Sequence, residues 1–364
     1  GNCDQLVFFD NSVCLRCSSP LGYSPDDRRL VALRADGDVL APIGVDGDPM
    51  RRCGNELVAG CNWLVSADAA PGTLCPSCRL TSVRPADDDH AAMGAFATAE
   101  AAKRRLLDQL NGLRLPVVDR ADDPEHGLAF ELLSARNHKV TTGHESGVVT
   151  LDLSESDDAY RVFVREQLGE PYRTVLGHLR HEVGHYFWDP LVVDTGRLDD
   201  FRHRFGDERL DYQQALASHY ADDQGGGGPD EGLPDGHVSR YATVHPWEDW
   251  AETFAHYLHI DDGLETAASF GLVVDDPARS FGAASWQTPT GPPSTDLGVA
   301  SMLDRWLGLT VAMNAMSRSI GQDDLYPFIL SPAVIDKLEF VHRTIIGIEP
   351  AVPAVPGFDG GAQG

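Results

Sequence analysis

The sequence predicts an α+β protein in three parts: a small β-rich module, a central region of helices and strands, and a group of C-terminal helices. All seven cysteines lie in the first quarter of the chain, among turn residues and short β-like runs such as 6–9 and 30–33. Helical spacing and period-two alternation follow each other between about 98 and 270. Helical spacing then returns at 298–318 and 332–346.

Composition excludes several classes of function. The 364 residues are 42% hydrophobic, and no run reaches the roughly 18 apolar residues that a membrane span requires. The net charge of 29 − 56 = −27 opposes binding to nucleic acid or to an anionic membrane. The first residues carry neither a basic start nor an apolar run, so no secretory signal is predicted. Cysteine pairs at two-residue spacing suit metal thiolates, which predicts a reducing, cytoplasmic location.

The cysteines of the first module predict structural zinc. Two Cys-x-x-Cys pairs have the spacing of zinc knuckles, and an odd number of cysteines disfavours a set of disulfides. One complete four-thiolate set is Cys53, Cys61, Cys75 and Cys78. A second set, one ligand short, is Cys3, Cys14 and Cys17. The sequence also allows an alternative in which Cys14 and Cys17 share a zinc ion with Cys75 and Cys78.

The central region is predicted to open with an amphipathic helix at about 98–113. Its apolar side is formed by Ala102, Leu106, Leu110 and Leu113. The basic run at 103–105 is expected to face largely outward. Two strands are predicted next, at 128–133 and 148–153, the second from its alternation of apolar and polar residues. His144, just ahead of this second strand, is a further residue that can line a cleft.

The run His181-Glu182-Val183-Gly184-His185 points to chemistry. It lies in a segment with helical spacing, expected to open at Glu170-Pro171 and to stop near Pro190. Histidines at i and i+4 share one helical face and can bind one zinc ion. Glu182 can then act as a general base toward a water at the metal. The alternative is a buried helix whose histidines only satisfy hydrogen bonds in the core.

Two histidines leave a catalytic zinc ion short of one protein ligand. Leu191, six residues beyond the second histidine, cannot bind a metal. The best source is the segment 247–258, where Glu248 and Glu252 lie one turn apart on a single stripe. One carboxylate can bind zinc while the other orients a ligating imidazole. The alternative is an acidic helix face exposed to solvent.

Three phrases carry a resemblance to a known family: Gly169–Thr174, Gly177–Asp189 and His245–Leu258. They resemble the signatures of zinc-binding metallopeptidases that have an N-terminal zinc ribbon, and the similarity spans almost the whole chain. The resemblance implies a zincin-like catalytic domain of the gluzincin type that hydrolyses peptide bonds. Chains of that family start with a Cys-x-x-Cys pair, which implies that the missing thiolate of the Cys3 set lies upstream of Gly1.

A more distant similarity, to the peptidase of anthrax lethal factor, implies roles for individual residues. That enzyme has a glutamate ligand, a second glutamate four residues later, and an assisting tyrosine seven residues before the ligand. In this sequence these positions are Glu248, Glu252 and Tyr241. Glu248 is therefore implied as the zinc ligand, ahead of Glu252, Asp249 or His245, and Glu252 as the group that orients a ligating histidine. Tyr241 is implied as a hydrogen-bond donor to the developing oxyanion, with a packed loop tyrosine as its alternative.

These patterns together predict a cytoplasmic zinc-dependent peptidase with one catalytic and one or two structural zinc ions. The expected segments are a zinc-ribbon module at 1–86, the zincin-like domain at 95–270, a helical extension packed on it at 271–348, and a disordered tail at 349–364. The expected substrate is a peptide or protein that pairs with the strand at 148–153 as a sheet edge. No nucleic-acid or membrane partner is expected, and the ribbon is a candidate for docking a protein partner.

Two other functions stay open at this point. A zinc-ribbon adaptor protein with an inactive peptidase-like domain would fit the ribbon, although an intact Glu182 argues against a dead scaffold. A zinc amidohydrolase acting on a small-molecule amide would use the same catalytic groups. A long groove beside the edge strand would favour peptides, whereas a closed pocket would favour small amides.

Overall fold

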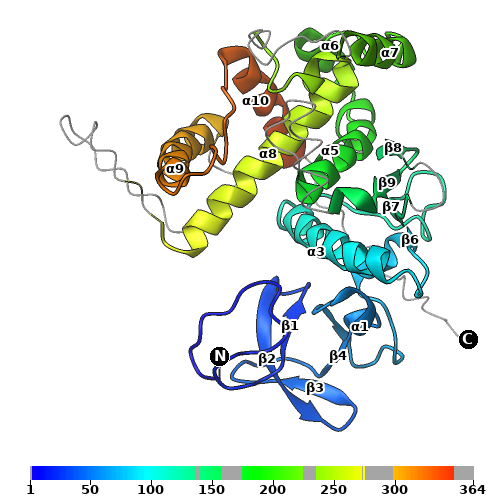
Figure 1. Ribbon diagram of the computed structural model, residues 1–364, viewed down its shortest axis with the longest axis vertical. Coiled ribbons are helices and arrows are strands. Elements are labelled where there is room, and N and C mark those ends of the chain that lie inside the picture. The colour runs from blue at the N-terminus through cyan, green and yellow to red at the C-terminus, as the bar shows by residue number, and fades with distance from the viewer. Residues whose placement is uncertain are drawn as a thin grey trace, which may run out of the picture.

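The computed structural model describes residues 2–135, 140, 142–156, 174–223, 235–272, 274 and 298–347. Figure 1 shows a β-rich N-terminal module, the long helix α3 (His90–Gly112) above it, and a body of helices beside a second sheet. The α+β class is therefore confirmed. The expected disordered tail at 349–364 lies outside the described residues, as does the phrase Gly169–Thr174 except for Thr174.

The N-terminal module is a five-stranded antiparallel sheet whose strands follow sequence order. Its strands are β1 (Leu21–Ser24), β2 (Arg29–Asp36), β3 (Val39–Pro42), β4 (Met50–Arg52) and β5 (Leu64–Ser66). The module also has two single-turn helices. Helix α1 (Glu56–Ala59) lies between Cys53 and Cys61 in sequence, and α2 (Pro76–Arg79) begins after Cys75 and contains Cys78. The predicted run at 30–33 lies in β2, whereas the run at 6–9 forms no strand. Leu6 and Phe8 of that run are exposed.

The second sheet has the strand order β6-β7-β9-β8. Its strands are β6 (Thr81–Val83), β7 (Ala129–Leu133), β8 (Gly143–Glu145) and β9 (Val148–Asp152). Strands β6, β7 and β9 run parallel to one another, and β8 runs antiparallel to β9. Strands at 128–133 and 148–153 are thus confirmed, but the expectation that 148–153 forms the edge is wrong. A two-residue turn, in which Ser146 and Gly147 both have positive φ, folds β8 back along β9, and β8 takes the edge.

Helix α3 packs on α1 and α2 of the N-terminal module and on α5 (Val175–Trp188) of the body. It begins at His90, earlier than the predicted 98, because the side chain of Asp89 caps it by accepting the Ala92 amide at 3.2 Å. Strand β6 lies within the range 1–86 expected for the ribbon, yet it pairs with β7 of the second sheet. The expectation that 103–105 faces outward is wrong for two of its residues: Lys103 and Arg104 are buried, and only Arg105 is exposed.

Helix α5 (Val175–Trp188) carries the histidine motif. It begins after Thr174, whose hydroxyl accepts the Gly177 amide at 2.9 Å, and therefore later than the expected opening at Glu170-Pro171. Its end at Trp188 agrees with the stop predicted near Pro190. The chain continues as one π-helical turn, η2 (Asp189–Val193), with the proline in its first turn, where a missing amide hydrogen is tolerated.

The helices predicted at 247–260, 298–318 and 332–346 are confirmed by α8 (Pro246–Ser269), α9 (Val299–Ser319) and α10 (Pro332–Ile346). Two shorter helices, α6 (Leu198–Phe205) and α7 (Tyr212–Asp223), lie between α5 and α8 in sequence, and short 3-10 turns form η1 (Leu153–Ser156) and η3 (Tyr241–Thr243). None of the helices in the described part of the chain combines the length and apolar character that a membrane crossing requires.

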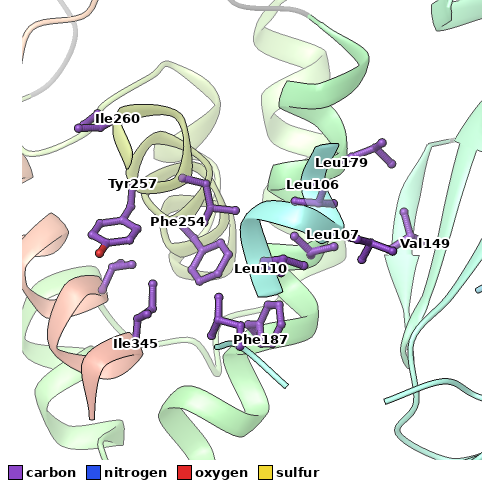
Figure 2. Packing of buried hydrophobic residues seen from close by; sticks show 14 of the residues in the cluster. Leu106, Leu107, Leu110, Val149, Leu179, Phe187, Phe254, Tyr257, Ile260 and Ile345 are labelled. Carbon is purple, nitrogen blue, oxygen red and sulfur yellow. The ribbon is translucent and has the colours of Figure 1, made fainter. Parts of the chain in front are cut away.

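Helix α8 is the central element of the body and packs on α5, α9 and α10. Figure 2 shows Phe254 of α8 facing Phe187 of α5, while the leucines of α3 lie between these helices and Val149 of the sheet. The same continuous core includes Tyr23, Cys53, Cys61, Cys75 and Cys78 of the N-terminal module, while Val31, Leu33 and Leu64 of that module form a separate small cluster. The larger core therefore extends from the N-terminal module to the second sheet and to α5 and α8.

Candidate metal centre

A glycine in the histidine motif lets two helices approach closely. The motif 181–185 lies on α5, and Glu248 lies in the first turn of α8. A Cβ atom on Gly184 would lie 3.0 Å from Cα of Ala251 on α8, so a larger residue would push the helices apart. Trp250 joins the helices by donating its indole N–H to the Gly184 carbonyl at 2.8 Å. This close crossing brings Glu248 to the two imidazoles.

Three ligand atoms meet between the helices. Nε2 of His181 lies 3.0 Å from Oε2 of Glu248 and 3.2 Å from Nε2 of His185. Nε2 of His185 lies 3.4 Å from the same carboxylate oxygen. A tetrahedral zinc ion bound to nitrogen and oxygen at about 2.0–2.1 Å sets its ligand atoms about 3.3 Å apart. The three separations therefore fit one zinc ion.

Two of the three ligand side chains, His181 and Glu248, are also oriented by hydrogen bonds to neighbouring residues. Nδ1–H of His181 donates to Oε1 of Glu252 at 2.7 Å, and the other oxygen of Glu252 accepts the Ser239 hydroxyl at 2.5 Å. The hydroxyl of Tyr212 donates to Oε1 of Glu248 at 2.5 Å, which leaves Oε2 toward the histidines. These contacts fix the imidazole tautomer with Nε2 as an acceptor, and they fix the rotation of the ligand carboxylate.

The charges of this cluster favour a positive charge between the carboxylates. Burial raises the pKa of Glu248, but hydrogen bonds with His181 and His185 hold it well below its ordinary value. Burial also raises the pKa of Glu252, which the contact with His181 nevertheless lowers to about 2. Two ionised carboxylates in a buried site need a compensating positive charge, from a proton or from a metal ion. The spacing of the ligand atoms favours the metal.

Glu182 lies beside the ligands and is not one of them. Its side chain is buried, and its Oε2 atom has no hydrogen-bond partner among the residues that the structure describes. Burial raises the pKa of this carboxyl, while the neighbouring His181 and His185 oppose that rise. An unpartnered carboxylate with a raised pKa is suited to accept a proton and to return it at near-neutral pH.

Two aromatic side chains flank the histidines. The ring of Tyr241, in η3, lies 5.7 Å from the ring of His181 between centroids. On the other side, His144 of the edge strand β8 stacks on His185 with centroids 6.2 Å apart. The Gly147 amide donates to Nε2 of His144 at 3.1 Å, so this ring carries its proton on Nδ1. The edge strand and η3 therefore border the same pair of imidazoles.

The other residues weighed as ligands lie elsewhere. His245 is the N-cap of α8, and its Nδ1 atom accepts an amide hydrogen of the first turn. Asp249 forms a buried ion pair with Lys337 of α10, with 2.5 Å between Oδ2 and Nζ. Leu191 is buried in the core. Within this segment, Glu248 is the residue that reaches both histidines.

The cysteines form two groups in space. The first group is buried and consists of Cys53, Cys61, Cys75 and Cys78. The second consists of Cys3, Cys14 and Cys17. The sulfurs of Cys61 and Cys75 lie 3.7 Å apart and those of Cys3 and Cys14 lie 3.6 Å apart, close to the roughly 3.8 Å that two thiolates on one tetrahedral zinc ion take. All seven cysteines are free of disulfides, and Cys14 and Cys17 do not join Cys75 and Cys78.

Sequence reasoning missed Tyr212 and Ser239. Tyr212 lies 36 residues before Glu248, on a different helix, and no spacing rule connects the two. Ser239 lies in a loop, and its role depends on how that loop folds over Glu252. Gly184 did carry a signal, because a glycine inside a helical pattern often marks close packing with a neighbouring element.

Replacing Tyr212 by Phe is expected to lower the zinc affinity of this centre about 10-fold, at the lower end of the cost of losing a group that orients a metal ligand. The phenyl ring would keep the packing against His245 and Trp247 while Glu248 loses the donor to Oε1. Competition with a chromogenic chelator measures the affinity. Tyr186→Phe, on α5, is the matched control. Equal affinities for both variants would contradict the role of Tyr212.

Comparison with known proteins agrees with this geometry. Residues 92–344 match the family described as "Putative zinc-binding metallo-peptidase", and residues 1–89 match a zinc-ribbon domain. An uncharacterized protein of Mycobacterium bovis is 47% identical over 350 residues, which cover 96% of this chain and 95% of the relative. Uncharacterized proteins of two Mycobacterium tuberculosis strains match to the same extent. No solved structure matches. The chain belongs to this zinc-binding metallopeptidase family and carries the zinc-ribbon domain at its N-terminal end.

Proposed function

We propose that the chain is a zinc-dependent peptidase of the zincin class and the gluzincin type. His181, His185 and Glu248 hold the catalytic zinc ion, and Glu182 is the general base. One observation carries the proposal: three ligand atoms lie 3.0–3.4 Å apart, next to the buried carboxylate of Glu182, whose Oε2 atom has no hydrogen-bond partner among the described residues. Membership of a metallopeptidase family supports zinc as the metal and a peptide or protein as the substrate.

The residues of the chain supply the proton transfers. Bound zinc supplies Lewis acidity, which makes water a nucleophile near neutral pH. Glu182 would accept a proton from that water as the water oxygen bonds to the carbonyl carbon of the substrate, and its raised pKa brings it closer to the working pH. When the C–N bond breaks, the same carboxyl returns the proton to the leaving amine. Tyr241, beside His181, donates a hydrogen bond to the carbonyl oxygen as negative charge develops there. Glu252 orients His181 through Nδ1.

The edge strand β8 supports an extended peptide as the substrate. Its outer side has no strand partner within the described ranges, so its main-chain groups are available for pairing. His144 in the middle of β8 stacks on His185, and a peptide paired with β8 would therefore pass the zinc ligands. β8 takes the substrate-binding role first assigned to the strand at 148–153.

The cysteine groups are proposed as structural zinc sites, one complete and one with three thiolates. Cys53, Cys61, Cys75 and Cys78 form the closed four-thiolate set that structural zinc prefers. Cys3, Cys14 and Cys17 bind a second ion with one further ligand. Free thiols throughout both groups suit a reducing compartment, and we propose the cytoplasm.

Replacing His181 and His185 together by Ala is expected to remove one zinc ion per chain and to leave the cysteine-bound zinc in place. Catalytic zinc held by three protein ligands is lost when two of them are removed. Elemental analysis of the purified full chain measures the zinc content. Replacement of the exposed His126 and His203 by Ala is the matched control, with no expected loss. An undiminished zinc content in the first variant would contradict the ligand assignment.

Peptidase activity itself is tested on a peptide library prepared from a whole proteome. Incubation with the zinc-loaded chain should create new N-termini detectable by mass spectrometry, and a chelator should suppress them until zinc is restored. Cleavage of small acyl amides without cleavage of peptides would identify an amidohydrolase instead. A chain that binds zinc at this centre but cleaves neither class would be the inactive, adaptor-like protein.

A further inference from the structure

Helix α3 buries two neighbouring cations: Lys103 lies against Thr81 of β6 and the ring of Phe130 of β7, and Arg104 lies against Ala59 of the N-terminal module. Lys103 and Arg104 are 0% and 3% exposed, whereas the adjacent Arg105 is exposed and pairs with Asp10. The helix belongs to the part of the chain that matches the metallopeptidase family, while the module it faces matches the zinc ribbon. Figure 1 shows α3 lying directly above this module. Two buried cations at such a boundary need partners.

Lys103 has a partner of opposite charge. Its Nζ atom lies 2.6 Å from Oε1 of Glu100, one turn earlier on the same helix, and both side chains are fully buried. The Thr81 hydroxyl donates to the same carboxylate oxygen at 2.5 Å. The other oxygen of Glu100 lies 3.6 Å from the sulfur of Cys78. Lys103 therefore offsets the charge of Glu100, the carboxylate that lies beside Cys78 of the four-cysteine group.

Arg104 has no such partner. Its Nη2 atom reaches the Ala59 carbonyl at 3.5 Å, while its Nε and Nη1 atoms are buried without a hydrogen-bond partner in the described part of the chain. Ala59 lies two residues before Cys61, so the guanidinium lies beside the chain segment that carries this cysteine of the four-cysteine group.

We propose that Arg104 is the counter-charge of the ribbon zinc, so that helix α3 closes the four-cysteine site from outside the ribbon. Four thiolates around one zinc ion carry a net charge of two minus, and a buried guanidinium is the group that would offset part of it. Four neutral thiols would leave the guanidinium without any counter-charge. The inference rests on the proposed zinc at Cys53, Cys61, Cys75 and Cys78.

The consequence concerns the role of the ribbon. Cys78 lies in α2, and the chain passes from there into β6, which pairs with the sheet that also contains β8 and β9. The zinc ion would thus hold together α2, β6 and α3 at one boundary. The ribbon is then a fixed part of the peptidase body, stabilised by a cation from that body, and not a detachable docking module.

The test measures how firmly the four-cysteine group keeps its zinc in the full, zinc-loaded chain. Each cysteine is followed separately, by alkylation in the presence of a chelator and peptide mapping. In Arg104→Gln, alkylation of Cys53, Cys61, Cys75 and Cys78 is expected to be about 10–100-fold faster than in the wild type, the usual cost of losing a group that supports metal ligands. The separate group Cys3, Cys14 and Cys17 is expected to react at an unchanged rate.

Two further variants decide the cause. Arg105→Gln removes a charge from the next residue of α3 and is expected to leave all rates unchanged, because Arg105 is exposed. Arg104→Lys keeps the charge and is expected to retain zinc within a few-fold of the wild type. It also carries the test if Arg104→Gln does not fold. Equal rates for Arg104→Gln and Arg105→Gln, or release from Arg104→Lys more than about 10-fold faster than from the wild type, would overturn the inference. Wild-type cysteines that hold no zinc would overturn the structural site itself.

Discussion

Glu182→Gln is expected to lower the turnover of peptide substrates by about 10²–10⁴-fold while the chain keeps its full zinc content. The amide has almost the shape of the carboxylate but cannot accept the proton of the attacking water. Glu182 supplies none of the three ligand atoms that meet between α5 and α8, so the variant should keep its zinc ion. Its Oε2 atom has no hydrogen-bond partner in the described residues, and the substitution therefore breaks no contact of that atom.

The measurement compares kcat and zinc content of the same preparations on a peptide identified by the library digestion. Glu339→Gln on α10, whose side chain is half exposed, is the matched control and should behave as the wild type. Loss of zinc in Glu182→Gln would mean that Glu182 supports the metal. Unchanged turnover with zinc retained would remove Glu182 from the mechanism and would favour a different base.

The elements that the sequence predicted correctly are those whose buried face follows from the spacing of their own apolar residues. Apolar residues at helical spacing located α8, α9 and α10, and histidines at i and i+4 lie on one face of α5 whatever the rest of the chain does. Period-two alternation located β9 but could not show that β8 pairs beside it. That pairing depends on the turn at Ser146-Gly147, where a serine adopts a positive φ that sequence seldom signals.

The basic run of α3 shows the limit of such reasoning. Three consecutive residues on a helix point in three directions about 100° apart, so they cannot all face solvent when the helix is covered on both sides. The N-terminal module and the second sheet cover different sides of α3: Arg104 contacts Ala59 of the module, and Lys103 contacts Thr81 of β6 and the ring of Phe130 of β7. Whether a cation can be buried depends on the groups that it contacts. For Arg104 these groups belong to a module whose last cysteine, Cys78, lies 26 residues earlier in the sequence.

Within the candidate site, the metal ligands were easier to predict than the residues that orient them. Zinc requires particular ligand types at short range, so the motif on α5 and the glutamates of α8 stand out in the sequence. Tyr212 and Ser239 act through single hydrogen bonds that many side chains can make, and they depend on how loops return to α8. Their residue types alone therefore do not predict their roles in the site.

The two glutamates of α8 are expected to differ in what they do for the metal. Glu248→Ala is expected to abolish zinc binding at this centre, because Oε2 is the ligand atom 3.0 Å from Nε2 of His181. Glu252→Ala is expected to weaken binding by about 10–100-fold, because it removes the acceptor that holds Nδ1 of His181 but no ligand. Glu265→Ala, further along the same helix and partly exposed, should leave affinity unchanged.

Competition titrations with a chelator measure the zinc affinity of this centre and distinguish these outcomes. They use the full chain with zinc bound at the cysteine sites. The roles differ because Glu248 and Glu252 lie one turn apart, and the crossing at Gly184 brings only the earlier one level with both Nε2 atoms. Complete zinc loss in Glu252→Ala with binding retained in Glu248→Ala would reverse the two roles. Such a result would leave the histidine motif as the metal site, but it would remove the argument from spacing that connects Tyr241 with the ligand seven residues later.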